Sequence, residues 1–362
     1  MNLPSILDKQ YSNERLSALE AQRLAHEISF GPIVFQVSRL MIKFGILQML
    51  LDSEDGLTLE EITEKSKLSK YACQCLLESS LTIGTVLCKN NKFTCSKAGW
   101  FLLNDPLVRV DIDFNHDVNY LGWFYLEEAL LNGKPEGLKV FGNWSTIYEG
   151  LSQLPEKVQD SWFSFDHYYS DQSFDEALQI VFANNPKTLL DVGGNTGRWA
   201  LRCVDYNEDV KVTIMDLPQQ IALMKHHTAG KNGANRIFGH GCNLLDKNVP
   251  FPTGFDAIWL SQFLDCFSEE EVTSILARAA KSMHNNTKLY IMETFWDRQR
   301  FETAAYALTQ ISLYFTALAN GNSKMYHSDD MIRCIENAEL KVDEITDEVG
   351  KGHSVVVCSI KN

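Results

Sequence analysis

The chain has 362 residues, of which 45% are hydrophobic and 22% charged, a balance typical of globular proteins and a length that allows two domains. Its formal net charge of −14 argues against a protein that binds the phosphate backbone of nucleic acids, because such proteins present a basic face. The nine cysteines form no CxxC pair, and no signal-peptide pattern or apolar run long enough for a bilayer is present, so we expect a cytoplasmic protein with reduced thiols.

The N-terminal part of the chain predicts three helices and a small β-hairpin. Apolar residues recur at helical spacing over 38–51, which predicts the first helix. Thr58 followed by Glu61 is the capping-box pattern for a second helix, and Ser69 is the expected N-cap of a third. Two short strand signals in 87–96 then predict a hairpin.

This order of elements is the pattern of a winged-helix domain, which we expect over residues 1–105. A winged helix that reads DNA needs several Arg, Lys, Asn or Gln side chains on its third helix, and here that helix carries Lys70 near its start and then Glu78. We therefore expect the domain to serve packing or dimerisation. In particular, the apolar stretch 40–51 has too little partner surface in so small a domain, and we expect it to be buried across a two-fold interface.

Residues 106–178 predict a helical connector that is unusually rich in aromatic side chains. Such side chains either pack into a core or line a pocket for a flat, apolar ligand, and the sequence leaves both interpretations open. The aromatic residues concerned are Phe141, Trp144, Tyr148, Trp162, Phe163, Phe165, Tyr168, Tyr169 and Phe174.

Residues 179–362 predict an α/β domain in which strands alternate with helices. Five strand and helix steps predict a mostly parallel sheet, and a closing hairpin through Gly350 and Gly352 adds one antiparallel strand. The seven strand candidates are 187–194, 210–218, 234–241, 255–261, 288–294, 340–349 and 353–360.

The segment LLDVGGNTGRWA, residues 189–200, predicts a strand, a glycine-rich turn and the start of a helix. It does not fit the dinucleotide fingerprint, because the first glycine would fall on Val192. Asp191 would repel a pyrophosphate but suits a cation. Asp216, 19 residues after Gly197, ends the second strand, where an acid accepts hydrogen bonds from ribose hydroxyls. A ligand with a ribose, no phosphate and a positive charge is S-adenosylmethionine.

Three segments, LLDVGGNTG, TIMDLP and FDAIWLSQFLDCFSEEE, behind a winged-helix-like front part, resemble the two-domain S-adenosylmethionine-dependent O-methyltransferases of plant phenols and bacterial polyketides and pigments. The resemblance covers residues 14–360. It implies a class I methyltransferase sheet behind an N-terminal dimerisation domain, S-adenosyl-L-methionine as cofactor, a homodimer, and a small aromatic hydroxyl as acceptor. The sequence shows no His, Asp or Glu cluster at ligand spacing, so we expect no metal, and its net charge and short apolar runs lead us to expect no nucleic-acid partner and no membrane.

Two further segments, SQFLDCF and FDHYYSD, are similar to enzymes of bacterial aryl-polyene pigment pathways. This similarity raises methylation of a ring carbon as a second possible reaction, because a phenolate also activates the carbon beside it. Two hypotheses from different functional classes stay open as well, namely a scaffold that binds the cofactor without catalysis and a winged-helix regulator.

The resemblance also implies which residues hold the cofactor. Asn195 replaces the middle glycine of the family's motif and tolerates a positive φ better than most residues. The family's adenine-contacting pair falls near GCNLL, with room for a slip of one position. The implied cofactor residues are Asp191, Gly193, Gly194, Gly197, Asp216, Leu217, Asn243, Leu244, Ser261 and Gln262.

Asp265 stands where the family has its catalytic histidine, because Leu264 to Phe267 match the motif Leu-His-Asp-Trp. Ser268 with Glu271 predicts a helix N-cap, so Asp265 should lie on the turn at the carboxyl end of the fourth strand, an edge where ligands bind in open α/β sheets. Glu293, at the end of the fifth strand, matches the carboxylate that steadies the family's histidine.

Three hypotheses about the base follow from this replacement. Asp265 accepts the phenol proton itself, or His167 or His327 does so. In the third hypothesis no base is needed, because holding the phenol close to the methyl group and removing water from it suffice for transfer, and Asp265 only positions the phenol.

Overall fold

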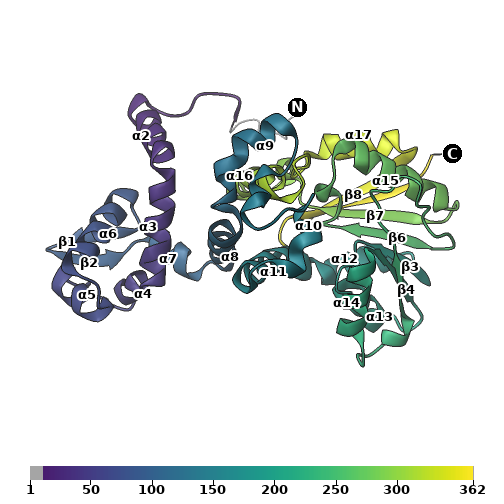
Figure 1. Cartoon of the computed structure of the whole chain (residues 1–362), viewed down its shortest axis with the longest axis horizontal. Helices are drawn as coiled ribbons and strands as arrows, with labels where there is room; N and C mark the ends of the chain where they lie inside the picture. Colours follow the sequence, from purple (N-terminus) through teal and green to yellow (C-terminus); the bar gives the residue numbers. More distant parts are fainter. Residues whose placement is uncertain (1–10, 362) are drawn as a thin grey trace. The chain divides into compact units, whose positions relative to one another are not determined.

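The structure is a computed structural model that describes residues 11–361, and it divides into two compact units, 11–117 and 118–361 (Figure 1). The domain limits predicted from the sequence, at residues 105 and 178, stay a prediction. Within residues 11–361, no helix combines the length and the apolar character needed to cross a membrane.

The first unit consists of helices and one hairpin, in the predicted order. Its core is formed by buried side chains that include Met41, Leu47, Ile62 and Leu77. The elements are α2 (Ala18–Ser29), α3 (Gly31–Lys43), α4 (Ile46–Leu51), α5 (Leu59–Ser66), α6 (Lys70–Ile83), β1 (Val86–Lys89), β2 (Lys92–Cys95), α7 (Lys97–Asn104) and α8 (Pro106–Phe114).

Local hydrogen bonds explain why several of these elements begin where the sequence predicts. Thr58 and Glu61 form a reciprocal capping box at the start of α5, and the Ser69 side chain caps α6. The hairpin turns through Asn90 and Asn91, whose φ values of 51° and 58° are both in the left-handed region that tight hairpins require.

One expectation for the stretch 38–51 is wrong, and the premise of the expectation for 40–51 does not hold. The stretch is not one helix: α3 ends at Lys43 and α4 starts at Ile46, because Gly45 takes a left-handed conformation with φ 70°. Nor does it need a second chain for burial, because Met41, Leu47 and Leu50 are already buried in the unit's own core.

The second unit contains a seven-stranded sheet with the order β5-β4-β3-β6-β7-β9-β8, in which β9 runs opposite to the other strands. The predicted α/β fold, with a mixed seven-stranded sheet, is therefore confirmed. The strands are β3 (Thr188–Val192), β4 (Lys211–Asp216), β5 (Ile237–Gly241), β6 (Ala257–Ser261), β7 (Lys288–Glu293), β8 (Leu340–Val349) and β9 (His353–Ile360).

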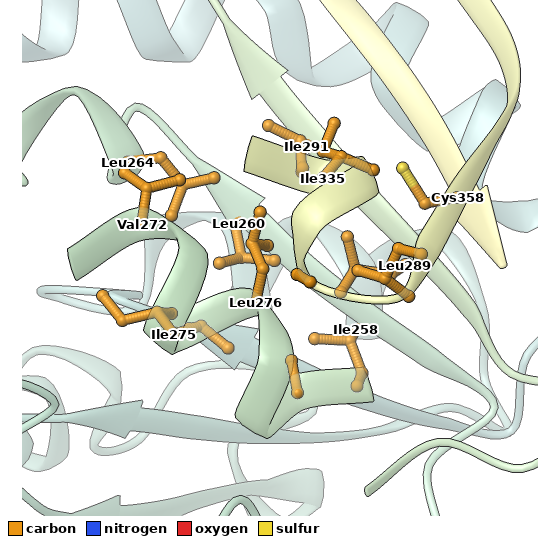
Figure 2. Packing of buried hydrophobic residues seen from close by; sticks show 14 of the residues in the cluster. Ile258, Leu260, Leu264, Val272, Ile275, Leu276, Leu289, Ile291, Ile335 and Cys358 are labelled. Carbon is orange, nitrogen blue, oxygen red and sulfur yellow. The ribbon is translucent and has the colours of Figure 1, made fainter. Parts of the chain in front are cut away.

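Helices cover both faces of this sheet (Figure 1). Figure 2 shows side chains of α15 and α17 packing onto one face, with Leu276 beside Leu260 and Ile335 beside Ile291. The helices that matter below are α10 (Ile147–Gly150), α11 (Glu156–Ser170), α12 (Phe174–Phe182), α13 (Arg198–Tyr206), α14 (Pro218–Thr228), α15 (Glu269–Ser282), α16 (Glu302–Tyr314) and α17 (Ser328–Asn337).

The strand order reverses at β3, which pairs with β4 on one side and with β6 on the other. In open α/β sheets the loops diverge at such a point and leave a crevice at the carboxyl ends of the strands. The loops after β3 and β6 are the glycine-rich turn and the turn that carries Asp265. The fold therefore brings the two most informative sequence motifs to one edge.

Candidate active site

A cavity of about 620 Å³ lies at this edge, within the second unit. Its wall is built from the loops after β3, β4, β5 and β6 and from side chains of α11 and α16. The sequence-predicted residues that line it are Asp191, Gly193, Gly194, Asp216, Leu217, Asn243, Leu244, Ser261, Gln262, Asp265 and His167. Gly197 and Glu293 do not line it, and their positions are described below.

The glycine-rich turn after β3 leaves no room for side chains at its first two glycines. A Cβ at Gly193, where φ is 74°, would lie 2.2 Å from the Phe263 ring, and a Cβ at Gly194 would lie 2.4 Å from Asp191 Oδ2. Asn195 follows with φ 48°, so it adopts the left-handed conformation that a glycine would otherwise supply.

Gly197 has a different place from the other two glycines. It precedes α13 with φ 82°, and a Cβ there would meet Met224 at 3.0 Å and Thr228 at 3.1 Å, both on α14. The structure thus places Gly197 where α13 packs against α14 rather than in the cavity wall.

Asp216, the last residue of β4, is tied to the glycine-rich turn. Its Oδ2 accepts a hydrogen bond from the Asn195 N–H at 2.9 Å, and its Oδ1 accepts one from the Leu217 N–H at 2.7 Å. Burial raises the pKa of Asp216 above its ordinary value, and these two hydrogen bonds oppose the rise. The carboxylate keeps further lone pairs that a ligand in the cavity can use.

Three residues of the wall carry buried oxygen atoms without a hydrogen-bond partner among the described residues: Asp191 Oδ2, Asn195 Oδ1 and Gln262 Oε1. Burial and the charge of Asp216 raise the pKa of Asp191 to about 8. Buried polar atoms normally have partners, so these acceptors indicate a ligand that donates hydrogen bonds and carries positive charge.

The wall after β5 is formed by four consecutive residues, Cys242 to Leu245. The Cys242 N–H donates to the Asp216 carbonyl at 2.8 Å, and Asn243 Oδ1 accepts from the Leu245 N–H at 3.0 Å. All four residues line the cavity. Even if the match to the family's adenine-contacting pair is shifted by one position, the matching residues therefore still lie in the cavity wall.

Asp265 lies on a single 3-10 turn, Leu264–Cys266, that follows β6. Its side chain is 6% exposed and lines the cavity, with the Cys266 thiol 3.4 Å from Oδ1. Burial raises the pKa of Asp265 to about 6. The predicted capping box of Ser268 and Glu271 forms at the start of α15 and fixes the far end of this loop.

Glu293 holds the Asp265 turn by its backbone. Glu293 ends β7, next to β6, and its Oε1 accepts hydrogen bonds from the N–H groups of Phe263 at 3.0 Å and Leu264 at 2.8 Å. Burial and the negative charge of Asp265 raise the pKa of Glu293 well above its ordinary value. Two neighbouring buried carboxyls do not both ionise, so we infer that Glu293 keeps its proton while Asp265 ionises first.

Two further side chains hold the same turn from outside the strands. The Asn320 amide donates to the Cys266 carbonyl, and the Tyr326 hydroxyl donates to the Phe267 carbonyl. Asn320 itself lines the cavity. The Asp265 carboxyl is therefore presented by a turn that is fixed at several of its backbone groups, which is the rigidity that catalysis requires.

The two candidate histidines differ in position. His167, on α11, lines the cavity, and its Nδ1 accepts a hydrogen bond from Arg198 Nη1 at 3.2 Å. Burial and the Arg198 charge lower the pKa of His167, which favours the neutral ring. His327 instead caps α17 through Nδ1, which accepts from the Asp329 N–H at 3.1 Å, and it is not part of the cavity wall.

The aromatic segment contributes one side of the cavity. Tyr148, Trp162, Phe165, Tyr169 and Phe174 line it. Trp144 packs against Gly142 and against Gly150 of α10, and Phe163 faces an adjoining second cavity that shares part of this wall.

The sequence did not single out Asp166 or Tyr314, which both line the cavity. Asp166 precedes His167 in the segment FDHYYSD. From the sequence, we considered only the histidine as a candidate, because a carboxylate on a helix is usually exposed to solvent. Tyr314 ends α16 and accepts a hydrogen bond from Trp162 Nε1 at 2.7 Å. No local pattern marks it. Over residues 11–361, no group of three or more His, Cys, Asp or Glu side chains is arranged to hold a metal ion.

Comparison with known protein families agrees with this geometry. A family model described as an O-methyltransferase domain matches residues 123–332, and one described as a Dimerisation2-like domain matches residues 22–93.

Among curated proteins, the chain is 22% identical over 303 residues to an L-tyrosine C(3)-methyltransferase from Streptomyces lavendulae, covering 83% of this chain and 81% of that protein. It is 20% identical over 305 residues to the acetylserotonin O-methyltransferase of Homo sapiens, covering 78% and 82%.

Among solved structures, the S-adenosylmethionine-dependent methyltransferase SibL in its apo form superposes with a TM-score of 0.70 and 19% identity, covering 93% of this chain and 98% of that one. The O-methyltransferase NcsB1, in complex with S-adenosylmethionine and 2-hydroxy-5-methyl naphthoic acid, superposes with a TM-score of 0.66 and 17% identity, covering 90% and 95%. At this level of identity, the two structures show the shared fold.

Proposed function

The chain belongs to the O-methyltransferase family, and on that premise we propose that it transfers a methyl group from S-adenosyl-L-methionine to the hydroxyl group of a small aromatic acceptor. The observation that carries this proposal is one cavity with two differently built ends. One end consists of the glycine-rich turn and Asp216, and the other consists of aromatic rings around Asp265.

The residues present fit the cofactor of this family. The unpartnered oxygens of Asp191, Asn195 and Gln262 suit its positively charged methionine end, and Asp216 suits the two hydroxyls of its ribose. When bound, the cofactor would supply an electrophilic methyl group on a sulfonium, whose sulfur can leave as a neutral thioether.

The acceptor end supplies a base beside an apolar wall. A phenol has a pKa of about 10, so a base that takes its proton raises its reactivity. Asp265 is the carboxyl in position to do this. The raised pKa of Asp265 makes it a stronger base than an exposed aspartate, and Glu293 fixes its turn. The aromatic rings hold the flat acceptor and exclude water.

Methylation of a ring carbon is the second candidate. It is favoured by the similarity to a protein named for C(3) methylation of L-tyrosine, and by chemistry, because removing the phenolic proton activates the neighbouring carbon as well. Relatives named for O-methylation, such as the acetylserotonin and caffeic acid enzymes, support the first candidate. The resemblance to aryl-polyene pathway enzymes stays a prediction.

Product analysis tests this proposal. The purified protein is incubated with S-adenosyl-L-methionine and a panel of simple phenols, and the products are examined by mass spectrometry and NMR. We expect a mass gain of one methyl group and a methoxy signal; a new methyl group on a ring carbon would support the second candidate. Binding of the cofactor without turnover of any phenol would favour a non-catalytic scaffold instead.

We also propose that the protein is a homodimer assembled through its first unit. The Dimerisation2-like match supports this, and so do apolar side chains of α2 and α3 that are largely exposed in the single chain, among them Leu19 at 78%, Ile28 at 70% and Ile33 at 59%. This surface differs from the stretch 40–51 that the sequence suggested.

Light scattering tests the dimer. The unmodified protein should have the mass of two chains at micromolar concentration, and Ile28→Glu should shift it toward one chain, because a buried charge destabilises an apolar interface. Leu87→Glu, at an exposed position on β1, is the matched control and should stay dimeric. A one-chain mass for the unmodified protein would refute the proposal.

We propose a cytoplasmic location because the cysteine thiols are not joined in disulfides. All nine cysteines are free in the structure, which suits a reducing compartment.

A further inference from the structure

Within residues 11–361, Asp166 has no hydrogen-bond or ion-pair partner, although it lines the acceptor end of the cavity. It lies on α11, half-buried, and its open side lines the cavity. No hydrogen bond or ion pair joins its carboxyl to any of residues 11–361. Burial, reinforced by the negative charges of Asp265 and Asp171 and opposed in part by the charge of Arg198, raises its pKa to about 7. An enclosed carboxylate without a partner is unfavourable, because burial disfavours its charged form.

The other carboxyl groups of the cavity wall already have a structural or proposed catalytic role. Asp216 clamps the glycine-rich turn, Glu271 caps α15, and Glu149 accepts from the Ser145 N–H. Asp191 lies beneath the glycine-rich turn at the cofactor end. Asp265 occupies the catalytic turn. Asp166 is thus the carboxyl at the acceptor end to which the proposed reaction and the fold give no role.

The cavity offers little positive charge to balance these acids. Among the residues of its wall, Arg198 is the only arginine or lysine. Arg198 is engaged elsewhere, because it forms an ion pair with Asp171 and donates a hydrogen bond to His167. Arg198 acts on Asp166 only through space, without an ion pair, so a cation bound beside Asp166 would find a carboxylate with no contact of its own.

The surroundings of Asp166 match the chemistry of an ammonium group. Trp162 and Phe165, on the same helix, and Tyr314 also line the cavity. Aromatic faces attract cations and shield a carboxylate–ammonium pair from water, which strengthens the pair.

We propose that the acceptor is a phenol bearing a protonated amine, with its hydroxyl at Asp265 and its ammonium group held by Asp166. This inference rests on the proposed function and names the substrate class of the same site. Asp166 is then a specificity-determining residue that contacts the substrate away from the reacting oxygen.

Tyramine and 4-ethylphenol provide the probe pair, because they share the ring and the chain length and differ in the amine. Both are titrated by calorimetry into the full-length protein saturated with S-adenosylhomocysteine, at about pH 8, where the Asp166 carboxyl is ionised and the amine still protonated. We expect tyramine to bind at least about 10-fold more tightly, the usual worth of a charge-assisted hydrogen bond. Equal affinities would overturn the inference, whether or not either phenol is methylated.

The variant Asp166→Asn tests whether Asp166 causes the preference for tyramine over 4-ethylphenol. The variant should lose most of the preference for tyramine while its affinity for 4-ethylphenol stays within about 3-fold, because asparagine keeps the shape but not the charge. Asp160→Asn, the same change at an exposed position of α11, should behave like the unmodified protein. A variant at position 166 that retains the full preference would show that the amine is held elsewhere.

Measurements of KM and kcat distinguish an effect on substrate binding from an effect on the methyl-transfer step. Because Asp166 acts away from the reacting oxygen, Asp166→Asn should raise KM for tyramine at least about 10-fold and change kcat little. An equal loss of kcat on both phenols would overturn the assigned role. Failure to methylate any phenol would contradict the proposed function alone, since the binding comparison decides the present inference independently.

Discussion

Replacing Asp216 by alanine should weaken the binding of S-adenosylhomocysteine by roughly 100-fold or more. Each hydrogen bond from a ribose hydroxyl to this charged acceptor is worth about 1.5 to 3 kcal/mol, and two such bonds correspond to at least about two powers of ten in affinity. The alanine variant also releases the N–H groups of Asn195 and Leu217, which Asp216 now fixes, and so loosens the turn that forms the cofactor wall.

Calorimetric titration of the unmodified protein and the variant measures this effect. Asp216→Asn keeps the shape of the side chain and removes its charge, so it should show a smaller loss than the alanine variant. Asp205→Asn, an exposed position on α13 outside the cavity wall, is the control and should bind as the unmodified protein does. Unchanged affinity in Asp216→Ala would contradict the ribose contact.

The parts of the fold that could be read from the sequence are those with local causes. The caps at Thr58 and Ser268 are hydrogen bonds between residues three positions apart, so the sequence displays both partners. The order of strands and helices follows from apolar periodicity, and the crevice at β3 and β6 follows from the strand order. The glycine-rich turn and the Asp265 turn each follow one of two paired parallel strands, which is why the fold brings them to one edge.

The parts that could not be read depend on packing between distant segments. The apolar pattern of 38–51 continues through Gly45, and nothing local distinguishes a helix that breaks there from one that runs on. Tyr314 and Asp166 reach the same cavity from α16 and α11, which are far apart in the chain. Gly197 looked like part of the ligand loop, and its contacts with α14 emerge only when the two helices are packed together.

Asp265→Asn should lower the rate of methyl transfer by roughly 100-fold or more, which is the usual worth of general-base catalysis. Asparagine keeps the size and the polarity of the side chain but cannot accept the phenol proton. Binding of S-adenosylhomocysteine should barely change, because the loss is confined to the transition state. Normal binding would also show that the Asp265 turn and the cofactor wall remain folded.

If Asp265 is the base, its ionisation should be visible in the dependence of kcat on pH. Burial raises the pKa of Asp265 to about 6, and only the ionised carboxylate can take a proton. The rate of the unmodified protein should therefore fall as the pH drops through about 6 and level off above it. In Asp265→Asn this acidic limb should disappear, and the rate should climb toward the pKa of the phenol, where solvent supplies the phenolate.

The most direct test of the account is therefore kcat measured against pH, on one accepted phenol, for the unmodified protein and Asp265→Asn. The account predicts a limb near pH 6 that only the unmodified protein shows, a loss of about 100-fold or more in the variant at neutral pH, and partial recovery of the variant in alkali. A loss of less than about 10-fold, with the acidic limb retained and no alkaline recovery, would contradict the assignment of Asp265 as the base and direct attention to His167.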